Sequence, residues 1–176
     1  MPIHLGDLDV VSQATGVNSA LIVPCNLCPA VTVAVNRKQP FMKLFRSWLK
    51  SEPFEQYIEA LRSRLGAQGV KTKVFRSNIY HQWFLCMWTD RRRKKLRKAA
   101  MNHDAVIVLG CDTANATVRD AVKATGTRVI EGMEVAGLMN AKLSIQFPGD
   151  ITFKDCKIIP ISQKQNEEMR ACHVTG

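Results

Sequence analysis

The chain has no long uninterrupted apolar run, and this sets the first limit on what it can be. Its most apolar stretch, residues 19–35, contains Pro24, Asn26 and Pro29, and it falls short of the roughly 20 apolar residues that a membrane-spanning helix needs. The first sixteen residues also lack the basic start and apolar core of an export signal. We therefore expect no membrane span and a cytoplasmic location.

Several patterns typical of enzymes and ligand-binding domains are also missing. No Ser-His-Asp or Cys-His arrangement stands at a recognisable spacing, so nothing supports hydrolase chemistry. The Gly-Lys-Ser/Thr ending of a P-loop, the Gly-x-Gly-x-x-Gly fingerprint and the Asp-x-His-x-x-Gly signature of a corrinoid-binding domain are absent. The absence of the last signature argues against a chain that carries cobalamin itself.

The composition is that of one globular domain. The 176 residues are 46% hydrophobic and 23% charged, which is enough to bury a core without disulfides. We expect a single α/β domain over residues 1–162, in which His4 lies near a loose start, and a flexible polar tail over residues 163–176.

The net charge of +10 comes mainly from one segment. Residues 91–98 hold seven Lys and Arg, and without these seven, 18 basic residues stand against 15 acidic ones, a net charge of +3. The protein is therefore a nearly balanced domain that carries one concentrated basic patch.

Short apolar runs alternate with amphipathic stretches along the chain. The pattern predicts strands at residues 19–24, 70–75, 104–111 and 127–130, with short strands at 143–147, 151–153 and 157–161 around a Pro-Gly-Asp turn. It predicts helices at residues 29–35, 41–50, 53–66 and 90–101, and one that Thr113 or Asn115 opens and Gly126 closes. Alternating strands and helices imply right-handed parallel crossovers. We predict a three-layer α/β sandwich with a mainly parallel sheet and an antiparallel C-terminal addition.

Four cysteines follow predicted strands. Cys25 and Cys28 come directly after the first strand, Cys86 lies in the aromatic segment after the second, and Cys111 follows the most apolar one. Because the carboxyl ends of parallel strands share one edge of the sheet, these thiols should converge there. Four thiolates suit tetrahedral Zn²⁺ or an iron–sulfur cluster. The sequence therefore predicts a metal site made of these four residues.

Other interpretations of the cysteines stay open. Without an export signal, the six cysteines are expected as thiols or metal ligands rather than disulfides. Cys25 and Cys28 could form a thioredoxin-like redox pair, and Cys86 and Cys111 could be buried small hydrophobic residues. Cys156, among the C-terminal strands, and Cys172, in the tail, are not expected to be ligands.

Two further segments could bind partners. Thr113 and Asn115 stand where a helix begins straight after a strand, so free backbone N–H groups there could hold an anionic cofactor or small molecule; ordinary capping is the alternative. The basic segment follows Tyr80, His81, Trp83 and Trp88. Such a segment can bind nucleic acid, dock an acidic protein or an anionic cofactor, or be a merely solvated face.

Residues 19–135 resemble the C-terminal-type, cysteine-rich domain of methylenetetrahydrofolate reductases from anaerobic bacteria, which can be a separate small subunit. The resemblance rests on a Leu-Ile-Val strand that ends in Cys25-x-x-Cys28, on the lone Cys86, and on Asp-Ala-Val-Ile-Val-Leu-Gly-Cys111-Asp. It implies metal or iron–sulfur ligation by these cysteines, and electron delivery to a flavin or corrinoid enzyme of one-carbon metabolism. The insert at residues 36–69 and the basic run at 91–98 depart from the family pattern.

These observations lead to one expected function and one alternative. We expect a metal- or iron–sulfur-binding accessory or electron-transfer subunit in anaerobic one-carbon metabolism, which docks an acidic protein such as a reductase or a corrinoid protein. A homo-oligomer is a further option. The alternative is a nucleic-acid-binding or regulatory α/β protein that works through residues 91–98, with a structural metal or none.

Overall fold

Two four-stranded sheets organise the chain. The computed structural model describes residues 3–43, 51–76, 85–147 and 149–161. A parallel sheet has the strand order β4-β2-β5-β6, and an antiparallel sheet has the order β1-β7-β8-β3. The strands are β1 (Ile3–Asp7), β2 (Ser19–Pro24), β3 (Met42–Lys43), β4 (Lys71–Val74), β5 (Ala105–Leu109), β6 (Arg128–Glu131), β7 (Met133–Gln146) and β8 (Asp150–Pro160). The helices are α1 (Val10–Gln13), α2 (Cys28–Asn36), α3 (Glu52–Ala67), α4 (Asp90–Ala100) and α5 (Asp112–Val122), with short 3-10 turns η2 (Leu85–Met87) and η3 (Lys123–Thr125).

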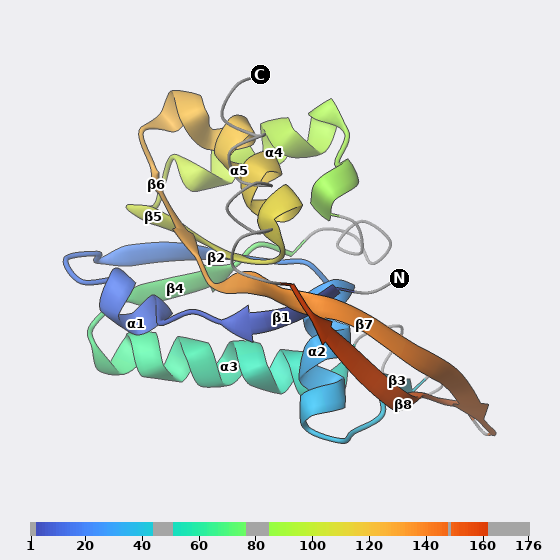
Figure 1. Ribbon diagram of the computed structural model, residues 1–176. Helices are drawn as coiled ribbons and strands as arrows, with labels where there is room; N and C mark the ends of the chain where they lie inside the picture. Colours follow the sequence, from blue (N-terminus) through green and yellow to red (C-terminus); the bar gives the residue numbers. More distant parts are fainter. Residues whose placement is uncertain (1–2, 44–50, 77–84, 148, 162–176) are drawn as a thin grey trace.

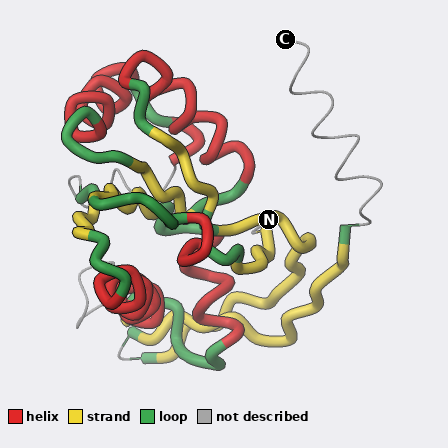
Figure 2. The backbone as a smooth tube through the Cα atoms, turned by 90° about the vertical axis from the view of Figure 1, so that its left-hand side faces the viewer, coloured by secondary structure: helices red, strands yellow, loops and turns green. Residues whose placement is uncertain are grey.

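The parallel sheet is covered on both faces, which explains the unbroken apolar runs of its central strands. Alternate residues of β2 and β5 enter two separate cores. Ile22 and Ile107 pack in the core shared with α2, α3 and the antiparallel sheet, whereas Leu21 and Val106 pack in the core shared with α4 and α5. Figures 1 and 2 show the parallel sheet between these two layers. The predicted three-layer α/β sandwich is confirmed.

The crossovers leave β2 and β5 in opposite directions. The connection from β2 to β4 runs through α2 and α3 on one face, and the connection from β5 to β6 runs through α5 on the other. The strand order therefore reverses between β2 and β5, which are adjacent in the sheet. In open α/β sheets, ligand sites form at the carboxyl ends of strands at such a point.

The antiparallel sheet is larger than the predicted C-terminal addition. The expected short strands are one long hairpin of β7 and β8, and the start of the chain is β1, which pairs with β7 through Leu5 and Val135. The expectation of a loose start was therefore wrong. The reason is that β1 buries Leu5 against Thr32 of α2, whose hydroxyl accepts a hydrogen bond from the Leu5 backbone N–H at 3.2 Å.

The helix predicted at residues 41–50 is wrong where it can be checked. Met42 and Lys43 form β3, and Met42 pairs with Ile151 of β8. Phe41 donates a backbone hydrogen bond to Ile151 at 2.8 Å and packs edge-on against Phe153, with the ring centroids 5.6 Å apart. These long-range contacts outweigh the helical spacing of the apolar side chains. Residues 44–50 lie outside the described residues, as do the predicted tail at 163–176 and the aromatic residues at 78–84.

No helix in the described ranges is both long enough and apolar enough to cross a bilayer.

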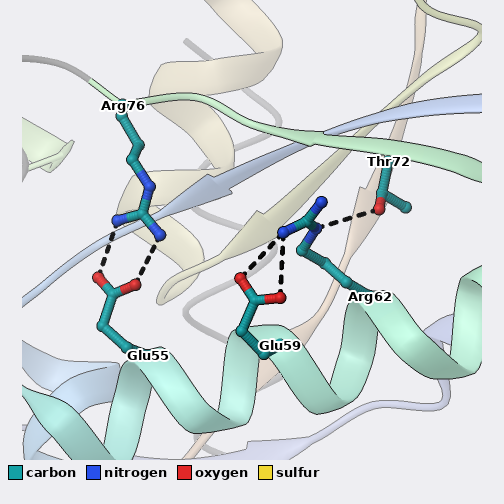
Figure 3. A network of polar contacts seen from close by, with 5 residues as sticks. All are labelled: Glu55, Glu59, Arg62, Thr72 and Arg76. Carbon is teal, nitrogen blue, oxygen red and sulfur yellow. Dashed lines mark hydrogen bonds and ion pairs between the residues drawn. The ribbon is translucent and has the colours of Figure 1, made fainter.

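Helix α3 holds the edge strand β4 through polar contacts (Figure 3). Arg76, just beyond β4, makes a bidentate ion pair with Glu55, with N···O distances of 2.9 and 2.6 Å. One turn further along α3, Arg62 pairs with Glu59 and donates to the Thr72 hydroxyl at 3.3 Å. The first pair joins residues 21 apart in sequence, so it fastens the end of β4 to α3.

A double-mutant cycle tests this clamp. We expect a coupling of about 0.5–1 kcal/mol between Glu55→Gln and Arg76→Gln in urea unfolding, because the pair is bidentate yet partly exposed. The matched pair Glu59→Gln and Arg62→Gln lies within one helix and should couple by only about 0.2–0.5 kcal/mol. Equal coupling in the two pairs would contradict the assignment of Arg76 as the stronger clamp.

Gly110 is required by close packing at the end of β5. A Cβ at this position would lie 2.6 Å from the Ala114 Cβ and 3.7 Å from the Cys25 Cβ, whereas a Cβ at Gly66 in α3 would meet nothing within 4 Å. We expect Gly110→Ala to lower the free energy of unfolding by about 1–3 kcal/mol through overpacking. Gly66→Ala should raise it by about 0.5–1 kcal/mol, because alanine favours helix. Denaturant titration of the two variants measures both changes, and a neutral Gly110→Ala would show that α5 can retreat without cost.

Candidate metal centre

Cys25 and Cys111 lie at neighbouring strand ends. Pro24 of β2 stands opposite Leu109 of β5 in the parallel register, and the Cys25 N–H donates to the Leu109 carbonyl at 2.9 Å. Cys25 therefore continues the pairing one residue beyond β2. Cys111 comes two residues after β5 and is the N-cap residue of α5.

Cys28 and Cys86 reach the same edge from other elements. Cys28 is the first residue of α2, three residues beyond Cys25. Cys86 lies in the 3-10 turn η2, which packs against α5. Cys25 is only 5% exposed, and the other three thiols are half-buried.

The pKa values of three thiols are raised, and burial is the largest cause in each. The pKa of Cys25 is raised to about 12, chiefly by burial; backbone hydrogen bonds oppose the shift, and repulsion from Cys28 and Cys111 adds to it. Burial also raises the pKa of Cys28, with added repulsion from Cys111 and Cys86. The pKa of Cys86 is raised by burial and by repulsion from Cys111. Each of the four thiols thus interacts electrostatically with at least two of the others, and their joint ligation of a metal ion stays a prediction.

Backbone donors and helix ends oppose this repulsion. N–H groups of Leu85 and Leu27 donate hydrogen bonds to the Cys25 sulfur and lower its pKa, and the N–H of Ile3 does the same for Cys28. Cys28 and Cys111 also stand at the starts of α2 and α5, where the helix dipole favours negative charge. The edge is therefore polarised to accept thiolates, although burial favours the protonated form of Cys25, Cys28 and Cys86.

The four cysteines do not form a ready-made metal site in the described part of the chain. Among the described residues, no three His, Cys, Asp or Glu side chains stand together in an arrangement that would hold a metal ion as it is. The donor chemistry fits zinc or an iron–sulfur cluster, because all four groups are soft sulfur ligands. Binding would have to draw the sulfurs together.

Of the two thiols predicted not to be ligands, the structure describes only Cys156. Cys156 is on β8, and its pKa is raised by burial and by the neighbouring Asp155, with no contribution from another thiol. Cys172 lies outside the described residues.

The structure excludes one of the two interpretations of the helix start at Thr113 and Asn115. Helix α5 begins at Asp112 with Cys111 as its N-cap and without a side-chain capping hydrogen bond, so ordinary capping by Thr113 or Asn115 is wrong. Thr113 is exposed, whereas Asn115 is 2% exposed and its Oδ1 and Nδ2 atoms have no hydrogen-bond partner among the described residues. The two side chains therefore do not share one surface. Their role in cofactor binding stays a prediction.

Three of the seven cations in the basic segment have a structural role. Arg92 is 8% exposed and lies over the Trp88 ring, 5.6 Å from its centroid, and burial lowers its pKa. Arg93 pairs with Asp120 of α5 at 2.7 Å. Arg97 donates through Nε to the Ala121 carbonyl at 3.0 Å. These three cations fasten α4 onto its neighbours, which the charge pattern alone did not indicate.

The sequence did not reveal the backbone donors of the site. Leu85 and Ile3 act through N–H groups, which any residue carries, so no residue type marks them. The apolar alternation of Ile3 and Leu5 was the one available signal for β1, and it is too short to stand out.

Comparison of the chain with protein-family models, with curated protein sequences and with solved structures found no match.

The raised pKa of Cys25 predicts a pH dependence of stability in the metal-free protein. An unfolded thiol ionises near its ordinary value of 9.0 and the folded one at about 12, so the folded state binds more protons between these values. Stability should therefore fall as pH rises above 9, by at most about 1.4 kcal/mol per pH unit from this residue. Urea unfolding between pH 8.5 and 10 measures this slope. The free energy of unfolding should fall less steeply with pH for Cys25→Ala than for wild type, by an amount that corresponds to about one proton. Identical slopes for the two proteins would contradict the raised pKa of Cys25.

Proposed function

We propose that this chain holds an iron–sulfur cluster or a zinc ion at Cys25, Cys28, Cys86 and Cys111. In this proposal the chain serves as an accessory, electron-transferring subunit of an oxidoreductase. The observation that carries the proposal is that Cys25 and Cys111 follow the paired ends of β2 and β5, with Cys28 at the start of α2 and Cys86 in η2, which packs against α5. Cysteines that serve only as small apolar core residues have no reason to lie together where the strand order of a parallel sheet reverses.

The same thiols suit a dithiol redox pair less well. The attacking cysteine of a Cys-x-x-Cys pair works as a thiolate, which needs a lowered pKa. Here burial raises the pKa of Cys25 to about 12 and that of Cys28 as well. A bound cation reverses this situation, because a coordinating thiol is deprotonated outright.

Bound at this edge, a cluster would supply one-electron transfer, and zinc would supply a structural cross-link. The protein's own groups would stabilise the negative charge of the thiolate ligands. The N–H groups of Leu27 and Leu85 donate to the Cys25 sulfur and that of Ile3 to Cys28, which stabilises charge on the thiolates. The starts of α2 and α5 add positive potential from opposite faces of the sheet.

The biological context rests on the resemblance to the cysteine-rich domain of anaerobic methylenetetrahydrofolate reductases. On that resemblance we propose a role in one-carbon metabolism, with an acidic reductase or corrinoid protein as the partner; the proposed cytoplasmic location rests on the missing export-signal pattern. A nucleic-acid-binding role gains no support from the described residues, because Trp88 is buried and three cations of α4 are bound within the protein.

Metal and acid-labile sulfide analysis of anaerobically prepared protein tests the proposal. A cluster should give a brown protein with matching amounts of iron and sulfide, and zinc should give a colourless protein with one ion per chain, on the order of 1 equivalent. Cys25→Ser should lose most of the metal, since it removes the most buried ligand.

The matched control is Cys156→Ser, which removes a half-buried thiol outside the site and should retain the metal. Equal metal content in Cys25→Ser and Cys156→Ser would overturn the site. Wild-type protein that takes up neither zinc nor a cluster under reducing conditions would overturn the function.

A further inference from the structure

The far half of β7 has an edge with which no described strand pairs. Strand β1 pairs with β7 only as far as Leu138, whereas β8 runs along the other side of β7 as far as Gln146. Residues 139–146 therefore point backbone N–H and C=O groups toward the side that β1 leaves open. We call residues 139–146 the free edge. Figure 1 shows this end of the β7–β8 hairpin projecting away from the helices.

The side chains of the free edge form one apolar row and one polar row. The extra residue of the bulge between the two strands lies on β8, because Asn140 pairs with Lys157 and Lys142 pairs with Lys154. Side chains of β7 therefore alternate between the two faces of the sheet all along the free edge. The apolar row is Met139, Ala141, Leu143 and Ile145, and the polar row is Asn140, Lys142, Ser144 and Gln146.

The apolar row begins in the core and continues beyond it. Met139 is fully buried, whereas Leu143 is 59% exposed and Ile145 is 66% exposed. Phe147, directly after β7, is 95% exposed. Adjacent exposed apolar side chains of this size are typical of a surface that another molecule covers.

The outer edge of β8 is protected against pairing, and the free edge is not. Strand β8 carries the bulge, the exposed Lys154 and Lys157, and Pro160, which are features that keep sheet edges from associating. The free edge has a single charged residue, Lys142, and its Nζ lies 2.9 Å from the carboxylate of Asp155 on β8. This ion pair reduces the charge that would repel another strand, so the free edge is the side of the hairpin that can pair.

The sequence of the free edge is complementary to itself. In an antiparallel pairing of two copies about a two-fold axis at Leu143, this residue faces its own counterpart, Ala141 faces Ile145, and Lys142 faces Ser144. Apolar residues then meet apolar ones on one face of the joined sheet, and polar residues meet polar ones on the other. A shift by one residue would set the apolar row of one copy beside the polar row of the other. An axis at Lys142 would set two like charges opposite each other.

We propose that the free edge is a dimer interface, at which two copies of this chain join their antiparallel sheets by pairing β7 with β7 about a two-fold axis at Leu143. A second copy is the occupant because it supplies the matching order of apolar and polar residues in the register that avoids opposed charges. Such a contact closes after two copies, and the protected edge of β8 adds no further strand. The proposal does not depend on the proposed function of the cysteines.

Sedimentation velocity of the full chain under reducing conditions tests the proposal. One strand edge per copy is a small interface, so we expect a reversible dimer with a dissociation constant on the order of 10 µM. Leu143→Lys should raise this constant at least about tenfold, because it sets two like charges against each other at the axis. The matched control is Leu138→Lys, which makes the same change at a 42% exposed leucine of β7 outside the free edge. It should leave the constant within about twofold of wild type.

A pair of opposite charges locates the axis. Leu143→Lys and Leu143→Glu should each dimerise poorly alone, and an equimolar mixture of the two should regain the dimer, because residue 143 of one copy lies opposite residue 143 of the other. Urea unfolding at a concentration well below the dissociation constant should give both variants the midpoint of wild type, since Leu143 is 59% exposed in the single chain. That result separates a lost interface from a lost fold.

Three outcomes overturn the proposal. The first is a wild-type chain that stays monomeric up to about 200 µM, twentyfold above the expected constant; if Leu143→Lys then weakens its binding to phosphatidylcholine vesicles, the apolar row contacts lipid instead. The second is a dimer that Leu143→Lys and Leu138→Lys weaken equally or not at all, which uses another surface. The third is a Lys–Glu mixture that stays monomeric, which rules out the pairing about Leu143.

Discussion

The candidate site depends on the parallel pairing of β2 with β5. The hydrogen bond from the Cys25 N–H to the Leu109 carbonyl carries this pairing to the last residue before the loops. Since neighbouring strands lie about 4.8 Å apart, each strand inserted between the pair would separate Cys25 from Cys111 by that much again. The reversal of strand order at this point also brings the starts of α2 and α5 to the edge from opposite faces. The apolar runs of the two strands therefore position the thiols indirectly, because they fix the neighbours in the sheet.

Burial has opposite effects on the two protonation states of these thiols. A neutral thiol packs as a small apolar group, so Cys25 adds to the core of the metal-free protein. A thiolate at the same position is costly, as the raised pKa of Cys25 shows. Helix starts and the N–H groups of Leu27, Leu85 and Ile3 offset part of that cost but not all of it. On the proposed function, the remainder is what a bound cation compensates, so the site would select strongly for a positively charged occupant.

The sequence predicted what depends on local pattern and missed what depends on distant partners. The run at residues 19–24 and the helix at Asp90–Ala100 were predicted correctly, because continuous apolar and charged stretches identify them. The rule for parallel strand ends led to the prediction that Cys25 and Cys111 follow neighbouring strands, which the pairing of β2 with β5 bears out. Strand β3 was missed because its pairing with β8 is a long-range contact that helical spacing hides. The structural roles of Arg92, Arg93 and Arg97 were also unpredictable, since they depend on the packed positions of Trp88, Asp120 and Ala121.

The four cysteines differ in how deeply they are buried. Cys25 lies in the core at the end of β2, shielded by Leu85, whereas Cys86 is half-buried and adjoins the exposed Met87. A centre buried on every side would be stable but slow to exchange electrons, and one exposed on every side would be open to solvent and oxidants. On the proposed function, Cys86 is then a ligand next to an exposed side chain, because Met87 follows it in η2.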